Sequence, residues 1–172
     1  MTDRIDALRI EPILHKHQRK NFDCGEDSLN EYISLYARQN DTQNIARTFV
    51  AVDDDHLVLG YYSISAASIE FAELPEELAK HLPGYPVPAA RIGRLAIDQS
   101  VQGQGLGARL LTNALQRICT ASGEMGIKIV LVDALNAKAR AFYAHFGFIP
   151  LPGEKTGLFL PIETVTGIFQ SK

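Results

Sequence analysis

A glycine-rich loop carries the clearest chemical signal in this chain of 172 residues. It reads Gln102-Gly103-Gln104-Gly105-Leu106-Gly107 and joins a predicted strand to a predicted helix. Because glycines lack a Cβ, their amide N–H groups can approach an anion, and a helix N-terminus adds free N–H groups and positive partial charge. The pattern predicts a phosphate or pyrophosphate site formed by the amides of Gly103, Gln104, Gly105, Leu106 and Gly107, with Gln102, Ala108 and Arg109 beside them.

Two other interpretations of the loop stay open at this point. A plain connecting turn is one, although a single glycine would suffice for it. A dinucleotide-binding fold is the other, since Gly103, Gly105 and Ala108 also satisfy the pattern G-x-G-x-x-G/A. In that fold Asp133 would bind a ribose hydroxyl. Only 39 residues follow Asp133, too few for the remaining strands and crossovers.

The composition is that of a packed globular protein. Hydrophobic residues make up 46% and charged residues 22% of the chain, which excludes disordered and collagen-like classes. At about 150 residues per domain, the length predicts a single domain over residues 1–172. No apolar run approaches the roughly 20 residues that cross a bilayer, and no secretion signal is visible, so we expect a cytoplasmic protein. Cys24 and Cys119 lack metal-ligand spacing, and we expect no metal.

The charge is unevenly distributed. The formal net charge is −3, which argues against a chain that coats nucleic acid through its overall charge. Residues 91–172 nevertheless hold 9 Lys/Arg against 5 Asp/Glu, so anion binding is expected in the second half of the chain.

Hydrophobic periodicity predicts which elements position the loop. Apolar residues at 29, 32, 33 and 36 indicate an amphipathic helix to about Asn40, and Asn136 is placed to cap a later helix that ends at Gly147. Proline residues between 83 and 88 predict a stiff connection that is neither helix nor central strand. Strands are expected over 8–13, 48–52, 57–64, 91–98, 127–132 and 158–165, with further helices over 74–81 and 105–123. This order predicts a mixed α/β or α+β layered domain.

Two segments resemble a known family. The run Arg94-Leu95-Ala96-Ile97-Asp98, followed by Q-x-x-G-x-G, resembles the acyl-CoA signature of the GNAT superfamily of N-acetyltransferases, and Asn136, Ala139, Phe142, Tyr143 and Gly147-Phe148 resemble its second CoA-contacting segment. More specifically, Phe22-Asp23-Cys24-Gly25, the helix to Asn40 and Tyr61-Tyr62 resemble the GNAT-type toxins of bacterial toxin–antitoxin systems, the TacT/AtaT-like group. The resemblance implies a central mixed, mostly antiparallel sheet flanked by helices on both faces.

The resemblance also implies a coenzyme and roles for site residues. The coenzyme is acetyl-CoA, whose pantetheine arm pairs with the strand that contains Leu95, Ala96 and Ile97, while Asn136 and Phe142 contact it from the later helix. Tyr143 is the candidate acid for the departing sulfur, since a phenol with a pKa near 10 stays protonated at neutral pH. An ordinary core position is the alternative for Tyr143. No general base stands out, although Glu70, Glu73 or an ordered water remain open.

By resemblance, the substrate is aminoacyl-tRNA acetylated on its α-amino group, and the partner is a ribbon-helix-helix antitoxin. An α-amine, with a pKa near 7.7 to 8.0, is partly neutral without a base, whereas a lysine amine near 10.4 is not. The resembling toxins are usually homodimers. We expect a phosphate-binding rim of cationic residues: Arg91, Arg94, Lys16, Arg19, Lys20 and Arg140. Open alternatives are an acetyltransferase for a small amine or a protein N-terminus, and a non-catalytic CoA-binding module.

Overall fold

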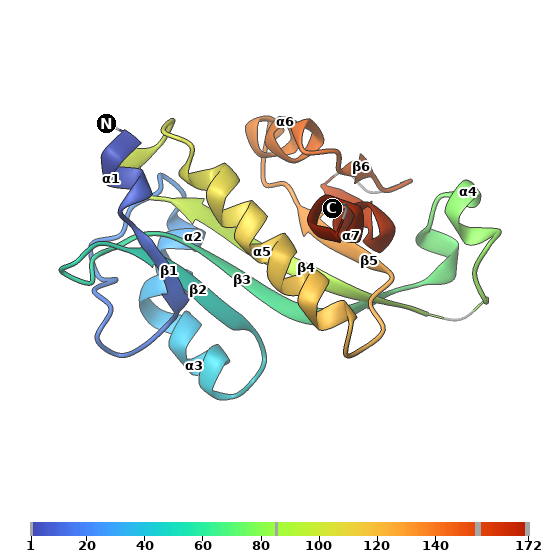
Figure 1. The fold of residues 1–172 in the computed structure, drawn as a ribbon, viewed down its shortest axis with the longest axis horizontal. Helices are drawn as coiled ribbons and strands as arrows, with labels where there is room; N and C mark the ends of the chain where they lie inside the picture. The colour runs from blue at the N-terminus through green and yellow to red at the C-terminus, as the bar shows by residue number, and fades with distance from the viewer. Residues whose placement is uncertain (1, 85, 154–155, 171–172) are drawn as a thin grey trace. The chain divides into compact units, whose positions relative to one another are not determined.

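The computed structural model describes residues 2–84, 86–153 and 156–170. Its strands follow the order β1-β2-β3-β4-β5-β7-β6 (Figure 1). The strands are β1 Arg9–Pro12, β2 Arg47–Val52, β3 Val58–Ile69, β4 Val87–Ile97, β5 Ile129–Asp133, β6 Ile149–Pro150 and β7 Gly157–Pro161. The α-helices are α1 Thr2–Asp6, α2 Asp27–Glu31, α3 Ala37–Thr42, α4 Glu76–Ala79, α5 Leu106–Ser122, α6 Ala137–His145 and α7 Ile162–Gln170. The mixed sheet with helices confirms the predicted α/β class.

Contacts divide the chain into two compact units. Unit 1 comprises Met1–Ser65 and Arg94–Leu115, and unit 2 comprises Ala66–Gly93 and Gln116–Lys172. The glycine loop belongs to unit 1, and α6 with Tyr143 belongs to unit 2. The single domain over residues 1–172 stays a prediction.

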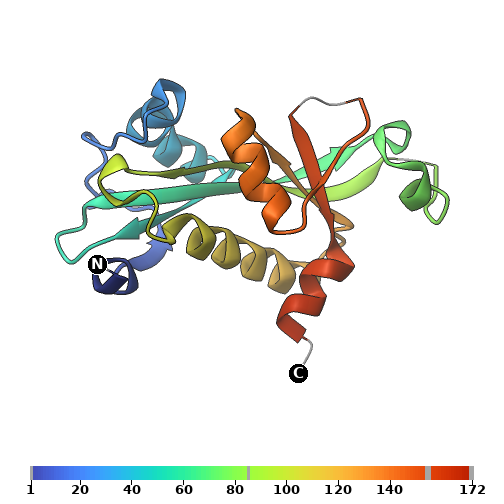
Figure 2. The ribbon, with the colours of Figure 1, turned by 90° about the horizontal axis from the view of Figure 1, so that it is seen from above.

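In unit 1, two adjacent tyrosines on β3 tie the sheet to a helix on each face. The Tyr61 hydroxyl donates to the carbonyl oxygen of Leu29 in α2 at 2.7 Å, and the Tyr62 hydroxyl donates to Asn113 Oδ1 in α5 at 2.6 Å. Successive side chains of a strand point to opposite faces. Helix α2 and the first turns of α5 therefore cover opposite faces of this part of the sheet, as Figure 2 shows.

Gly60 allows the close approach of α5 to β3. A Cβ built at this position would lie 3.0 Å from Leu110 Cδ1 and 3.1 Å from Leu106 Cδ2. Both leucines are fully buried. The contact fixes the beginning of α5, and with it the end of the glycine loop, against the sheet.

The helix predicted from Leu29 to Asn40 exists, but its middle is a π-helix from Tyr32 to Tyr36. Each π turn holds an extra residue and shifts the register of the face that follows. Consequently Ala37 is fully buried, whereas Tyr36, predicted on the buried stripe, is 48% exposed. The prediction for Tyr36 was wrong for this reason.

In unit 2, β4 and β5 run parallel, with Ala89 to Ile92 of β4 opposite Ile129 to Val132 of β5. Strand β7 pairs antiparallel with β5, and the short β6 pairs antiparallel with β7. All four residues of β5 that pair with β4 are buried, as the apolar run from Ile127 predicts, although the strand begins two residues later.

Two other sequence predictions were wrong in detail, and one helix was missed. The last strand ends at Pro161 and not at Val165, because helix α7 begins at Ile162 and buries Val165. Pro88 lies inside β4, where its carbonyl oxygen accepts the Lys128 N–H at 2.9 Å, so the proline connection ends earlier than predicted. The N-terminal helix α1 was not predicted. Within the described residues, no helix has the length and apolar character needed to cross a membrane.

Removal of the Tyr61 hydroxyl should reveal how much the α2 contact stabilises unit 1. We expect Tyr61→Phe to lower the free energy of unfolding by about 1 kcal/mol, because the part-buried Leu29 carbonyl loses its donor. Burial also raises the pKa of Tyr61 far above 10, so the unfolded chain loses this proton first and stability falls as pH rises above about 10. Urea unfolding at pH 7 and 10.5 measures both effects.

Tyr36→Phe is the matched control, because Tyr36 is 48% exposed. It should change neither the stability at pH 7 nor its alkaline slope. An equal effect of the two substitutions would contradict the assigned role of the Tyr61 hydroxyl.

Candidate acyl-coenzyme site

The glycine loop is open and its backbone is shaped for an anion. Gly103 has φ +76° and Gly105 has φ +92°, and a Cβ at either position would meet nothing within 4 Å. Among the described residues, the amides of residues 103–107 donate no hydrogen bond, and the first bond of the helix runs from the Arg109 N–H to the Gly105 carbonyl. Five unclaimed N–H groups thus stand at the N-terminus of α5, a helix of 17 residues.

Side chains hold this loop in place. Gln102 Nε2 donates to the carbonyl oxygens of Ile97 at 2.8 Å and Cys24 at 3.0 Å. The Asp98 carboxylate accepts from the Ser100 hydroxyl at 2.6 Å and from the Asp23 N–H at 2.9 Å. Partial burial works to raise the pKa of Asp98, but these hydrogen bonds hold it below its usual value. The loop is therefore anchored to the segment at 23–24.

Arg109 and Gln102 were expected as additional donors to the anion. In the structure, Arg109 donates from both terminal nitrogens, to the carbonyl oxygens of Ile5 and Leu8 at 2.6 Å each. Its guanidinium thereby fixes the N-terminal segment to α5. Both side chains hold structure together here, and their part in binding an anion stays a prediction, as does that of Ala108.

On its edge away from β3, strand β4 continues beyond its register with β5. Its register with β5 covers Ala89 to Ile92, but β4 continues to Ile97. On this stretch lie Leu95, Ala96 and Ile97, of which Ala96 is buried. Main-chain groups on a strand edge without a partner can form hydrogen bonds to an extended chain, as they would to an additional strand. Binding of the pantetheine arm to Leu95, Ala96 and Ile97 stays a prediction.

In unit 2, α6 begins and ends as predicted. The Asn136 side chain caps it by accepting the Ala139 N–H at 2.9 Å, and Gly147 follows its end with φ +95°. Tyr143 is 5% exposed and packs edge-on against Phe142 and Phe148, with ring centroids 5.3 and 5.5 Å away.

The Tyr143 hydroxyl is a protonated donor. It has no hydrogen-bond partner among the residues that the structure describes. Burial, followed by the negative charge of Asp133, raises the pKa of Tyr143 to about 12. The phenol therefore keeps its proton throughout the physiological pH range.

A small cavity of about 60 Å³ lies in unit 2, lined in part by Glu73, Arg91 and Asp133. Arg91 Nη1 lies 2.9 Å from Asp133 Oδ2, so its charge is paired. From the sequence, Asp133 was predicted to have a role only in the alternative dinucleotide-binding fold, as a ligand of a ribose hydroxyl. Nothing in its local sequence signals the pairing, because the partner is 42 residues away and meets it through the β4–β5 pairing.

The six cationic residues predicted as a rim belong to different units. In unit 1, the Arg94 guanidinium lies 3.7 Å from the centroid of the Tyr32 ring, Arg19 donates to the Ile33 carbonyl at 3.0 Å, and Lys16 and Lys20 are exposed. In unit 2, Arg91 is paired and Arg140 is partly buried in α6. Arg38, which sequence reasoning missed, lines a cavity together with Arg19.

One cluster in unit 1 has the residue types of a metal site. Ligand atoms of Glu11, His17 and His56 lie within 4.8 Å of one another. However, His17 Nδ1 accepts the Leu14 N–H at 2.9 Å, so the ring proton of a neutral His17 is on Nε2, which lies 2.6 Å from Glu11 Oε1. This hydrogen bond, opposed by partial burial, lowers the pKa of Glu11. Within the cluster, Glu11 and His17 form a hydrogen-bonded pair. This bond occupies His17 Nε2, the nitrogen that a metal ion would need as a ligand.

Known proteins share both the sequence and the fold. A family model described as "Acetyltransferase (GNAT) domain" matches residues 44–150. A protein of Sinorhizobium fredii named "Probable toxin TacT" is 35% identical over 169 residues, covering 92% of this chain and 93% of its own. A "tRNA-acetylating toxin" of Mycobacterium tuberculosis is 38% identical over 140 residues, covering 81% of this chain and 83% of its own.

Solved structures have the same fold. A tyrosine-to-phenylalanine mutant of KacT superposes with a TM-score of 0.90 at 36% identity, and AtaT complexed with acetyl-methionyl-tRNAfMet with 0.88 at 36%; each comparison covers 95% of this chain and 99% of the other. A tyrosine-to-phenylalanine mutant of AtaT, bound to the C-terminus of the antitoxin AtaR and to acetyl-CoA, gives 0.83 at 34% over 96% of this chain and 99% of its own.

The matched family model spans three segments: the glycine loop, the end of β4 with Leu95 to Ile97, and helix α6 with Tyr143. These are the segments for which the residues predicted acyl-coenzyme binding. The chain belongs to the GNAT family of acetyltransferases.

Proposed function

We propose that the protein is an acetyl-CoA-dependent N-acetyltransferase that modifies the α-amino group of aminoacyl-tRNA and thereby blocks translation. The observation that carries the proposal is the open glycine loop, whose unclaimed amides stand at the N-terminus of α5. The relatives support the substrate, since one is named a tRNA-acetylating toxin and another structure holds an acetylated aminoacyl-tRNA.

The residues fit an acyl coenzyme. Acetyl-CoA supplies the acetyl group as an activated thioester. The amides of residues 103–107 bind its diphosphate, because they offer five donors and the positive end of a helix dipole without a Cβ in the way at Gly103 and Gly105. Main-chain groups of Leu95, Ala96 and Ile97 hold the pantetheine arm, and an N–H of this strand donates to the acetyl carbonyl as charge develops on its oxygen.

Tyr143 provides the proton for the leaving sulfur. Its hydroxyl is protonated and has no other partner among the described residues, so it can donate a hydrogen bond without first breaking one. The attacking amine needs little help, because an α-amine with a pKa near 7.7 to 8.0 is partly neutral at pH 7. Glu73, which lines the small cavity with Arg91 and Asp133, is available to accept the proton that the amine loses.

The remaining assignments follow from the same substrate. Arg94, Arg140, Lys16, Arg19 and Lys20 contribute positive charge for the phosphates of the tRNA, whereas Asp133 offsets the charge of Arg91. A ribbon-helix-helix antitoxin holds the enzyme inactive, as the AtaT structure with its antitoxin suggests by analogy. Charged tRNA is found in the cytoplasm, and the protein acts there, as a homodimer.

A second candidate is acetylation of a small amine or a protein N-terminus. The net charge of −3 favours it, because an acidic chain attracts RNA poorly at long range. Incubation of the protein with labelled acetyl-CoA and aminoacylated tRNA separates the two. We expect label in the tRNA fraction that disappears after mild alkaline deacylation. Label found only in free amino acids or peptides would favour the second candidate, and no transfer at all would favour a non-catalytic CoA-binding module.

A carboxylate in the glycine loop should prevent coenzyme binding. Gly103→Asp places a negative side chain among the amides, and we expect acetyl-CoA affinity measured by calorimetry to fall at least 100-fold, since like charges repel and the amides are blocked. Gly153→Asp is the matched control: Gly153 has φ +73° against +76° for Gly103, and both sites are open. The two variants should be strained alike but differ in affinity. Equal affinities would remove the diphosphate from this loop.

Loss of the Tyr143 hydroxyl should slow the transfer and spare binding. We expect Tyr143→Phe to lower kcat 100-fold or more, consistent with the loss of an acid, while calorimetry shows acetyl-CoA affinity within about threefold of the wild type. Because the pKa of Tyr143 is raised to about 12, the wild-type kcat should not fall between pH 8 and 10 through loss of this proton. Phe146→Leu, a change beside the same ring cluster, controls for packing. An unchanged kcat in Tyr143→Phe would exclude the assigned role.

A further inference from the structure

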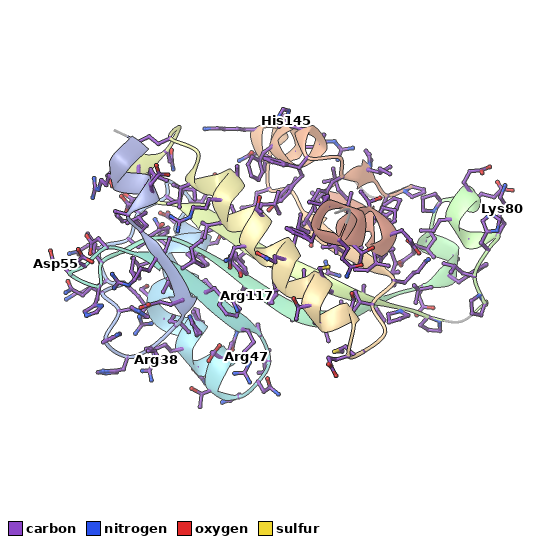
Figure 3. All side chains as sticks on the ribbon, viewed as in Figure 1. Arg38, Arg47, Asp55, Lys80, Arg117 and His145 are labelled. Atoms are coloured by element: carbon purple, nitrogen blue, oxygen red, sulfur yellow. The ribbon has the colours of Figure 1, made fainter. Side chains whose placement is uncertain are left out.

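A cavity lined by two arginines lies in unit 1, beside the helix from α2 to α3. A cavity of about 370 Å³ is lined there by Arg19 and Arg38 together with Ser34, Leu35, Gln39, Thr42 and Gln43. We call it the Arg19–Arg38 cavity. Figure 3 labels Arg38 on α3. The volume is large enough for a phosphate group with its nearest waters, and the lining includes two guanidinium groups and no carboxylate.

Arg19 retains unused donors. Its Nη1 donates to the Ile33 carbonyl at 3.0 Å, which fixes the side chain against the helix. Its Nε is buried and has no hydrogen-bond partner in the part of the chain that the structure describes. A buried donor without an acceptor destabilises the folded state, and an anion supplies the missing acceptor.

The two arginines also repel one another. Burial, followed by the like charge of Arg38, lowers the pKa of Arg19. Within the described ranges, Arg38 forms no ion pair, whereas Arg47 on β2 has Asp41 at 3.5 Å and Arg91 has Asp133 at 2.9 Å. Two arginines line one cavity without a counter-charge. A phosphate, which can accept hydrogen bonds from two guanidinium groups, would neutralise them.

The neighbouring loop adds positive charge. Residues 15–20 contribute Lys16 and Lys20, both exposed and close to Arg19 in the sequence. Several separate cations suit a polyanion with spaced charges better than a single small anion. We propose that the Arg19–Arg38 cavity binds a backbone phosphate of the RNA substrate. The proposal rests on the proposed function for the identity of the polyanion, and it gives RNA a contact at a place separate from the glycine loop.

The test measures binding of a synthetic RNA minihelix with an acceptor-stem sequence by fluorescence anisotropy at 50 to 400 mM salt. We expect Arg38→Gln to reduce the slope of log affinity against log salt by about one, and to weaken binding about eightfold at 0.1 M salt. Arg38→Gln leaves the bond between Arg19 and Ile33 intact, so the variant should fold. Arg19→Gln should add a similar decrease, and its folding is checked by circular dichroism.

Arg47→Gln is the matched control, because it removes an exposed arginine of unit 1 whose charge Asp41 already offsets. It should change the salt slope by much less than Arg38→Gln. An RNA affinity and salt slope in Arg38→Gln equal to those of Arg47→Gln would overturn the proposal. The proposal would also be overturned if Arg38→Gln lost binding to the antitoxin but kept its RNA binding, because the occupant of the cavity would then be an acidic protein segment.

The proposal and the proposed function fail in different ways. Wild-type protein that binds the minihelix through Arg38 but transfers no acetyl group to charged tRNA supports the cavity and contradicts the function. If the wild type and Arg38→Gln both acetylate charged tRNA with the same KM, the result supports the proposed function and contradicts RNA binding in the Arg19–Arg38 cavity.

Discussion

The amides that α5 leaves without partners are the feature on which the rest of the molecule depends. A helix cannot satisfy its own first N–H groups, and here a glycine loop keeps side chains away from them at Gly103 and Gly105. Everything around them serves to hold this arrangement open. Gln102 and Asp98 fasten the loop, Gly60 lets α5 lie close to β3, and Arg109 joins the helix to the N-terminal segment.

Electrostatics explains how an acidic protein can act on a polyanion. The net charge of −3 includes cations that are already paired, such as Arg91 with Asp133 and Lys128 with Glu163. A surface is recognised by its local field, which falls off over about 8 to 10 Å at physiological salt. For this reason, the local charge of a site such as the proposed Arg19–Arg38 cavity matters more to recognition than the net charge of the chain.

The π turn shows how one local irregularity propagates. Tyr32 and Ile33 are buried as the helical periodicity predicts, but the extra residue turns Ala37 inward and leaves Tyr36 at the surface. The same change of register sets the positions of Arg38 and Gln39 relative to Arg19. Hydrophobic periodicity assumes 3.6 residues per turn throughout, so it could not predict this outcome.

The sequence by itself determined the glycine loop, the cap at Asn136 and the mixed fold, because local steric and hydrogen-bonding rules act between residues close together in the chain. Comparisons bore out the family and the coenzyme. The tertiary structure alone decided the partners of Asp133, Arg109 and Arg19, since each meets groups that are distant in sequence. It also decided that Tyr143 keeps its proton, because burial, which raises its pKa, depends on packing that no short motif encodes.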